Sequence, residues 1–147
     1  MILVSACLLG VNCKYNGGNN KNQKVIEFLK EIEFIMVCPE ELGGLKTPRI
    51  PCEIVDESVG NLSKKKIKVI NKDGIDLTEN FVKGACETLE IAKSKNIKIA
   101  ILKAKSPSCG CGLIYDGKFN KKLVLGNSVT AQILKDNGIE VVTEEDI

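Results

Sequence analysis

The chain has 147 residues, a length that suits one domain with one hydrophobic core. Hydrophobic residues make up 44% and charged residues 27%, which excludes disordered and collagen-like chains, and no apolar run approaches the roughly 18 residues of a membrane span. The net charge of +2 and the 4% of aromatic residues argue against a nucleic-acid-binding surface.

The first third of the chain is predicted to form a strand, a helix and a second strand. Ile2–Ala6 is a short apolar run, typical of a strand that is buried on both faces. Apolar residues at helical spacing predict a helix within Asn22–Lys30, and another apolar run predicts a strand over Phe34–Val37. Residues 38–55 hold three of the four Pro and a Gly pair, which indicates a shaped loop.

The middle of the chain is predicted to contain a small hairpin or edge excursion, followed by a long helix. The first of these spans Ile54–Ile70, and its Lys-rich stretch Ser63–Lys68 is expected to face solvent. Asp76 and Glu79 resemble a capping box at the start of a helix that ends near Ser94. Its apolar face is predicted to contain Phe81, Val82, Ala85, Leu89 and Ala92.

The last third of the chain continues the alternation of strands and helices. Ile97–Leu102 is a third buried run, Ser128–Asn137 a last helix with Gly138 as its C-cap, and Glu140–Val142 a fourth strand. The predicted fold is therefore α/β, a single three-layer Rossmann-like domain over residues 1–147 with a mostly parallel sheet and helices on both faces. Such sheets bind ligands outside the carboxyl ends of their strands.

The absence of His and the abundance of Cys restrict the chemistry. Without His, a Ser-His-Asp triad, a Cys-His pair and a His-ligated zinc site are excluded. The N-terminal segment lacks the basic region and cleavage site of a secretory signal, so we expect a cytoplasmic protein. In that reducing compartment the seven Cys are expected to be thiols or metal ligands rather than disulfides.

Three Cys occupy equivalent places in the predicted topology. Cys7 and Cys38 end the first two strand runs, and Cys109 lies in the loop that leaves the third. Because parallel strands end at the same edge of a sheet, the three thiols are predicted to converge as metal ligands. Taken singly, Cys7 and Cys38 are each better explained as small buried hydrophobes, and only the set of three favours a shared thiolate site.

The other four Cys receive separate interpretations. Cys86 lies within the long helix and is predicted to be packing or surface filler. Cys52 follows a rigid PRIP segment, Cys111 forms CGC with Cys109, and Cys13 lies in the first loop. Spacing leaves open whether any of these three is a further ligand or a spare thiol.

Carboxylates and hydroxyls lie beside the candidate ligands. Glu40 and Glu41 follow Cys38 closely, and Ser106 and Ser108 precede Cys109, so these four side chains are candidates for proton transfer where His is absent. In the alternative, the Glu residues cap a helical turn and the Ser hydroxyls bond their own loop.

Two features of the middle loop suggest substrate contact. Arg49 is the only Arg of the chain and lies between two Pro, a rigid position suited to a planar or anionic ligand, although a structural Arg–carboxylate pair explains it equally well. The pair Gly43-Gly44 would let backbone approach a ligand closely, although turns also need Gly.

Several segments together resemble the thiouracil desulfidase family over nearly the whole chain. They are SACLLGVNCKYNGG, CPEELGGLKTPR, KSPSCG followed by IYDGKF, and GNSVTAQILKDNGIEVVTE. The resemblance implies an α/β domain that binds a 4Fe-4S cluster through Cys7, Cys38 and Cys109. It further implies that Glu40 and Ser106 are catalytic, and we add Arg49 and Ser108 as candidate substrate contacts.

The implied reaction removes sulfur from a thiolated pyrimidine without net redox change. Three thiolates leave one iron with an open position, to which the substrate sulfur binds. Glu40 activates water and Ser106 positions substrate or relays a proton, so that thiouracil yields uracil and hydrogen sulfide. The family pattern is looser at Cys13, so the resemblance does not make this residue a ligand, and the chain has Lys14 where the motif usually has Arg.

Two other classes of protein remain as alternatives. A structural zinc or cluster module would use Cys7, Cys13, Cys38 and Cys109 as a closed site without catalysis. A thiol redox protein would use Cys109 and Cys111, although CGC is not the CxxC turn of thioredoxin-like proteins. Neither a membrane nor a nucleic acid is expected as a partner.

Overall fold

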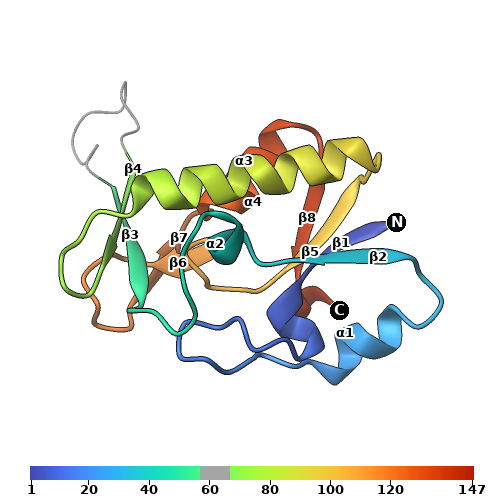
Figure 1. Cartoon of the computed structure of the whole chain (residues 1–147), viewed down its shortest axis with the longest axis horizontal. Coiled ribbons are helices and arrows are strands. Elements are labelled where there is room, and N and C mark those ends of the chain that lie inside the picture. Colours follow the sequence, from blue (N-terminus) through green and yellow to red (C-terminus); the bar gives the residue numbers. More distant parts are fainter. Residues whose placement is uncertain (57–66) are drawn as a thin grey trace.

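A parallel sheet lies at the centre of the molecule (Figure 1). The computed structural model describes residues 1–56 and 67–147. The strands lie in the order β2 (Phe34–Val37), β1 (Ile2–Ser5), β5 (Ile99–Leu102) and β8 (Glu140–Thr143), and each adjacent pair is parallel. The four predicted strands are confirmed, with their ends shifted by no more than two residues.

Alternating side chains of the strands enter two separate cores, which makes the domain three-layered. Successive residues of a strand point to opposite faces. One core lies under α3 (Thr78–Ser94) and α4 (Val129–Asp136), and its members include Leu3, Ala100, Leu102, Leu89, Ala92, Ala131 and Leu134. The other lies under the short helix η1 (Ala6–Leu9) and α1 (Gln23–Phe28), and it contains Ile2, Val4, Ile101, Leu8, Val25 and Leu29.

Two predicted helix starts carry side-chain caps. The side-chain amide oxygen of Asn22 accepts from the backbone N–H of Val25 at α1, and the Ser128 hydroxyl oxygen accepts from the backbone N–H of Ala131 at α4. The C-cap of α4 is Asn137, one residue before the predicted Gly138, which follows with φ of 78°.

The long helix differs from its prediction in two respects. The predicted capping box is wrong: the N-cap of α3 is Leu77, and Asp76 accepts from the N–H and hydroxyl of Thr78. Val82 was predicted on the buried face but is 42% exposed, because it is the residue next to Phe81 and points about 100° away around the helix.

The loop predicted after Cys38 contains a short helix, α2 (Pro39–Leu42), with Cys38 as its N-cap. A β-carbon at Gly43 would overlap the carbonyl oxygen of Asn80 in α3, and one at Gly84 would overlap that of Pro39. The two glycines therefore let α2 lie directly against α3. The predicted role of Gly43 in approaching a ligand is replaced by this packing role.

Two antiparallel hairpins flank the central sheet. The predicted one is confirmed by β3 (Cys52–Asp56) and β4 (Ile67–Asn71); the rest of its Lys-rich stretch, residues 63–66, lies outside the described residues. The other, β6 (Leu113–Tyr115) with β7 (Leu123–Leu125), was not predicted, because three-residue strands give almost no periodicity.

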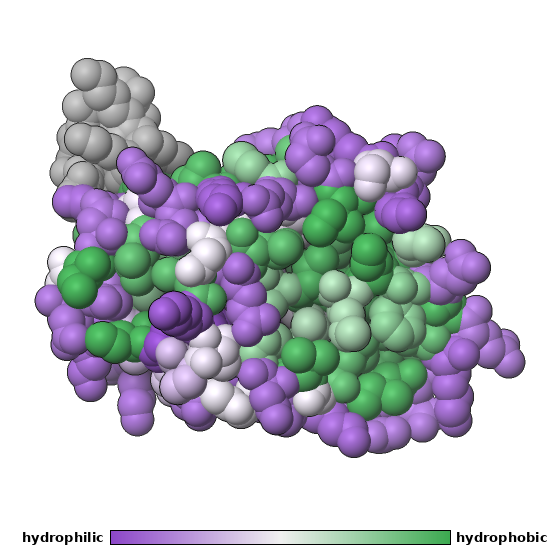
Figure 2. All heavy atoms as spheres, in the orientation of Figure 1, coloured by the Kyte–Doolittle hydropathy of each residue, from purple (hydrophilic) through white to green (hydrophobic). Residues whose placement is uncertain are grey.

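Strand β2 forms one edge of the sheet and leaves apolar surface exposed. Phe34 and Met36 of this strand are exposed, and Figure 2 shows an apolar area over this part of the molecule.

Within the described ranges, none of the helices is both long and apolar enough to cross a bilayer.

Candidate active site

A cavity of about 500 Å³ is bounded by the segments that follow β1, β2 and β5. This is the carboxyl edge of the sheet, where the topology predicts a ligand site. Its wall includes all three predicted ligands, Cys7, Cys38 and Cys109, together with Cys13 and Cys52. The structure thus brings together thiols that are far apart in the sequence.

Each predicted ligand is held by a different local structure. Cys7 lies in η1, directly after β1, and Cys38 lies at the N-terminus of α2. Cys109 is 4% exposed, in a loop whose N–H groups at Ser108 and Cys109 both donate to the hydroxyl oxygen of Ser106. The loop is tied to α4, because the Ser128 hydroxyl donates to the carbonyl oxygen of Ser108.

The three thiols differ in acidity because their surroundings differ. A hydrogen bond with the Cys13 thiol lowers the pKa of Cys7 to about 7, and Asn20 and Lys103 contribute in the same direction. The Cys13 thiol also lowers the pKa of Cys38. Burial raises the pKa of Cys109 to about 12. Since the thiolate is the form that binds a metal, a metal or cluster held by these thiols would displace their protons, and burial makes Cys109 the least acidic of the three.

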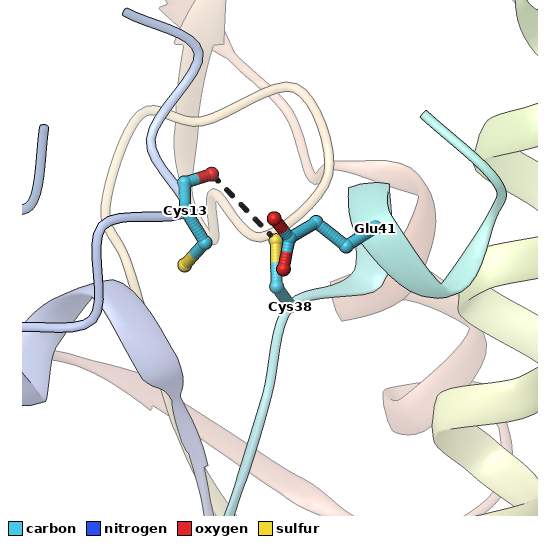
Figure 3. A group of neighbouring side chains, drawn as sticks. All are labelled: Cys13, Cys38 and Glu41. Carbon is cyan, nitrogen blue, oxygen red and sulfur yellow. Dashed lines mark hydrogen bonds between the residues drawn. The ribbon is translucent and has the colours of Figure 1, made fainter. Parts of the chain in front are cut away.

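Cys13 lies closer to the predicted ligands than its place in a loop indicated. Its thiol contacts those of both Cys7 and Cys38, and the residue is 3% exposed. In Figure 3 the carboxylate of Glu41 lies beside the Cys38 sulfur and the carbonyl oxygen of Cys13 points toward that sulfur, whereas the sulfur of Cys13 points to the other side. The two sulfur atoms and a carboxylate oxygen of Glu41 nevertheless lie within 4.8 Å of one another. Among the described residues, Cys86 and Cys111 do not line the cavity, whereas Cys52 does; burial raises the pKa of Cys52 to about 12.

Of the adjacent residues Glu40 and Glu41, Glu40 is the one that lines the cavity. One carboxylate oxygen accepts from Nε of Arg49 at 3.1 Å, and the other accepts from the Ser108 hydroxyl at 2.8 Å. Glu41 is absent from the cavity wall as the structure describes it, and its carboxylate accepts from the Thr47 hydroxyl at 2.6 Å. Successive residues of α2 thus have different surroundings, a distinction that the sequence left open.

The two predicted Ser residues form a chain of hydroxyls that ends at Glu40. Ser106 is half-buried in the cavity wall, and its hydroxyl oxygen lies 3.0 Å from that of Ser108, which is 2% exposed. Because Ser108 donates to Glu40, the Ser106 hydroxyl donates to Ser108. The alternative that these hydroxyls bond their own loop also holds for Ser106, which accepts two loop N–H groups.

Arg49 lines the cavity, but its hydrogen bonds go to protein atoms. Besides Glu40, the guanidinium donates to the carbonyl oxygens of Cys13 (2.8 Å) and Lys46 (3.3 Å) and to the Thr47 hydroxyl (2.8 Å). Burial lowers the pKa of Arg49, but Glu40 more than offsets this, so the pKa is raised. The observed contacts are therefore those of a structural Arg–carboxylate pair. That Arg49 also contacts substrate stays a prediction.

The unpredicted hairpin supplies a further wall of the cavity. Tyr115, Phe119 and Lys121 come from β6 and the loop that follows it. The buried carboxylate of Glu53 accepts from the N–H groups of Gly117 (3.0 Å) and Phe119 (3.2 Å), which fixes this loop. The motif IYDGKF contains the aromatic residues, but only the fold reveals that they face the cavity.

Comparisons with known proteins identify the family and the fold. The model of the 2-thiouracil desulfurase family matches residues 2–146. An uncharacterized protein, YbbK of Bacillus subtilis (strain 168), is 42% identical over 147 residues, which cover 100% of this chain and 97% of that protein. A solved structure of the [4Fe-4S]-dependent thiouracil desulfidase TudS superposes with a TM-score of 0.87 at 34% identity, covering 99% of this chain and 91% of that one. The family resemblance of the motifs is thus confirmed, and the chain belongs to the 2-thiouracil desulfurase family.

Proposed function

We propose that this protein binds a [4Fe-4S] cluster through Cys7, Cys38 and Cys109 and removes sulfur from a thiolated pyrimidine. In the net reaction thiouracil and water give uracil and hydrogen sulfide, so no electrons are gained or lost. The convergence of three thiols and the Glu40 carboxylate on one cavity carries this proposal. Membership of the family and the likeness to TudS support it.

The donor set fits such a cluster. Thiolates are the ligands that iron–sulfur clusters prefer, and the three thiols come from three rigidly held segments around a cavity of about 500 Å³. When bound through three thiolates, a cluster supplies an iron with an open position, a Lewis acid for the soft sulfur of a thiocarbonyl group.

Glu40 is placed to act as the general base. Its carboxylate lies in the cavity wall, and Arg49 fixes one oxygen while Ser108 fixes the other. The proposed step is that Glu40 takes a proton from the water that attacks the carbon of the C–S bond. The ion pair with Arg49 holds the carboxylate in one orientation.

The Ser hydroxyls offer a path by which that proton returns. In the resting arrangement the hydrogen bonds run from Ser106 through Ser108 to Glu40. When Glu40 carries the proton, the same hydrogen bonds reverse and deliver a proton at Ser106, in the cavity wall. The departing sulfur needs protons to leave as hydrogen sulfide, so Ser106 acts as the final donor.

The test is to purify the protein anaerobically and assay iron, acid-labile sulfide and zinc. We expect about four irons and four sulfides per chain, the content of one cluster. We also expect release of sulfide and uracil from 2-thiouracil with no electron donor present. Failure of the zinc-free protein to take up iron and sulfide would favour the structural module instead, and activity that requires an electron donor would contradict the non-redox reaction.

A further inference from the structure

A second group of metal-binding atoms uses a thiol that the proposed cluster does not need. The sulfur atoms of Cys13 and Cys38 and a carboxylate oxygen of Glu41 all lie within 4.8 Å of one another (Figure 3). Cys13 is buried, Cys38 is half-buried and Glu41 is exposed, so the group lies between the cavity and solvent.

The spacing of these atoms is close to that of a mononuclear site. Two thiolates at about 2.3 Å from a tetrahedral Zn²⁺ lie about 3.8 Å apart. Small side-chain movements would therefore close the three atoms around one ion and leave a fourth position for water. Two thiolates with one carboxylate are ligands that Zn²⁺ accepts.

The ligand atoms are held in place before any ion binds. Cys38 and Glu41 lie three residues apart at the start of α2, which the close contact at Gly84 holds against α3. The carbonyl oxygen of Cys13 accepts from Arg49 at 2.8 Å and from the Cys38 thiol at 3.9 Å. Two segments that are distant in the sequence thus keep their ligand atoms together, which reduces the entropic cost of binding.

We propose that Cys13, Cys38 and Glu41 form a mononuclear site for a thiophilic divalent cation such as Zn²⁺. This inference rests on the proposed function only in its consequence: Cys38 serves both sites, so the ion and the cluster exclude each other. A protein loaded with Zn²⁺ would then be unable to assemble its cluster.

Anaerobic titration of the reduced, cluster-free protein with Co²⁺ tests the site, followed by displacement with Zn²⁺. We expect thiolate-to-cobalt charge-transfer absorption and the intense visible bands of four-coordinate Co²⁺. Cys13→Ala and Glu41→Gln should weaken binding by more than the ~10–100-fold that altered outer-shell partners cause. Cys13→Ser, which keeps nearly the same volume, and circular dichroism of each variant control for misfolding.

Cys109→Ala is the matched variant, because it removes a proposed cluster ligand that lies outside the group. It should bind Co²⁺ as tightly as the parent. Equal affinity in Cys13→Ala and the parent would overturn the proposal, as would an equal loss in Cys109→Ala, which would mean that the ion uses the cluster ligands.

Cluster reconstitution separates this inference from the proposed function. One equivalent of Zn²⁺ should slow uptake of iron and sulfide by the parent but not by Cys13→Ala, and equal slowing would contradict the exclusion. Loss of Co²⁺ binding in Cys13→Ala, in a protein that takes up no cluster, would support the site and contradict the proposed function. Unchanged Co²⁺ binding in Cys13→Ala, in a protein that does take up the cluster, would contradict the site and support the proposed function.

Discussion

Arg49 and Glu40 form an ion pair in the cavity wall, with Nε 3.1 Å from Oε1 and side chains only 9% and 15% exposed. The same guanidinium binds the carbonyl oxygen of Cys13. One side chain therefore connects the first loop, the middle loop and α2, and holds the proposed base in place.

Arg49→Lys keeps the positive charge but loses the fork of donors, so Glu40 should become less well oriented. We expect kcat for sulfide release to fall by about 10-fold or more, with little change in KM or iron content. Steady-state kinetics of the reconstituted variant provide the measurement. A rise in KM at unchanged kcat would instead support the substrate contact predicted from the sequence.

Glu40→Gln should keep the fold and the iron content but lower sulfide release by roughly 10²–10⁴-fold, the usual cost of losing a general base. Glu41→Gln is the matched comparison, because Glu41 points toward Thr47, and its effect on turnover should be far smaller. Rates measured at equal iron content test this. Similar losses in the two variants would remove the special role of Glu40.

Cys7→Ala, Cys38→Ala and Cys109→Ala should each lose most of the iron and labile sulfide, because two thiolates hold a cluster poorly. Cys86→Ala is the control, since Cys86 is exposed on α3, away from the cavity wall. Metal analysis after anaerobic reconstitution measures the outcome. Full iron content in any one of the three would contradict its assignment as a ligand.

Glu53→Ala removes the acceptor of two loop N–H groups, so the loop after β6 should loosen and its aromatic residues should no longer be fixed at the cavity. We expect KM for 2-thiouracil to rise by about 10-fold, or ~1.4 kcal/mol, about the net worth of one or two hydrogen bonds. Glu53→Gln retains an acceptor oxygen and should change KM less. Faster hydrogen exchange over residues 116–121 in Glu53→Ala would show that this loop has loosened. Unchanged exchange would mean that a loosened loop is not the cause of the rise in KM.

The central sheet was predictable because buried parallel strands are continuous apolar runs, and the positions of Cys7 and Cys38 at strand ends followed from that. Residues in irregular segments were harder to place. Cys13 lies in the first loop, so no periodicity indicates where its thiol points. Likewise Glu40 and Glu41 are adjacent and identical in type, and only the short helix after Cys38 separates their surroundings.

The contact between α2 and α3 makes the site sensitive to residues that never touch it. Neither Gly43 nor Gly84 is in the cavity wall, yet a single methyl group at either would push apart the two helices that support Cys38 and Glu40. In a saturation mutagenesis screen scored by growth or sulfide release, both positions should therefore reject substitutions as strictly as the reactive groups do. Growth or sulfide release alone would not distinguish a reactive residue from one that supports the site. A comparison of the iron content of Gly84→Ala with that of Glu40→Gln would make this distinction.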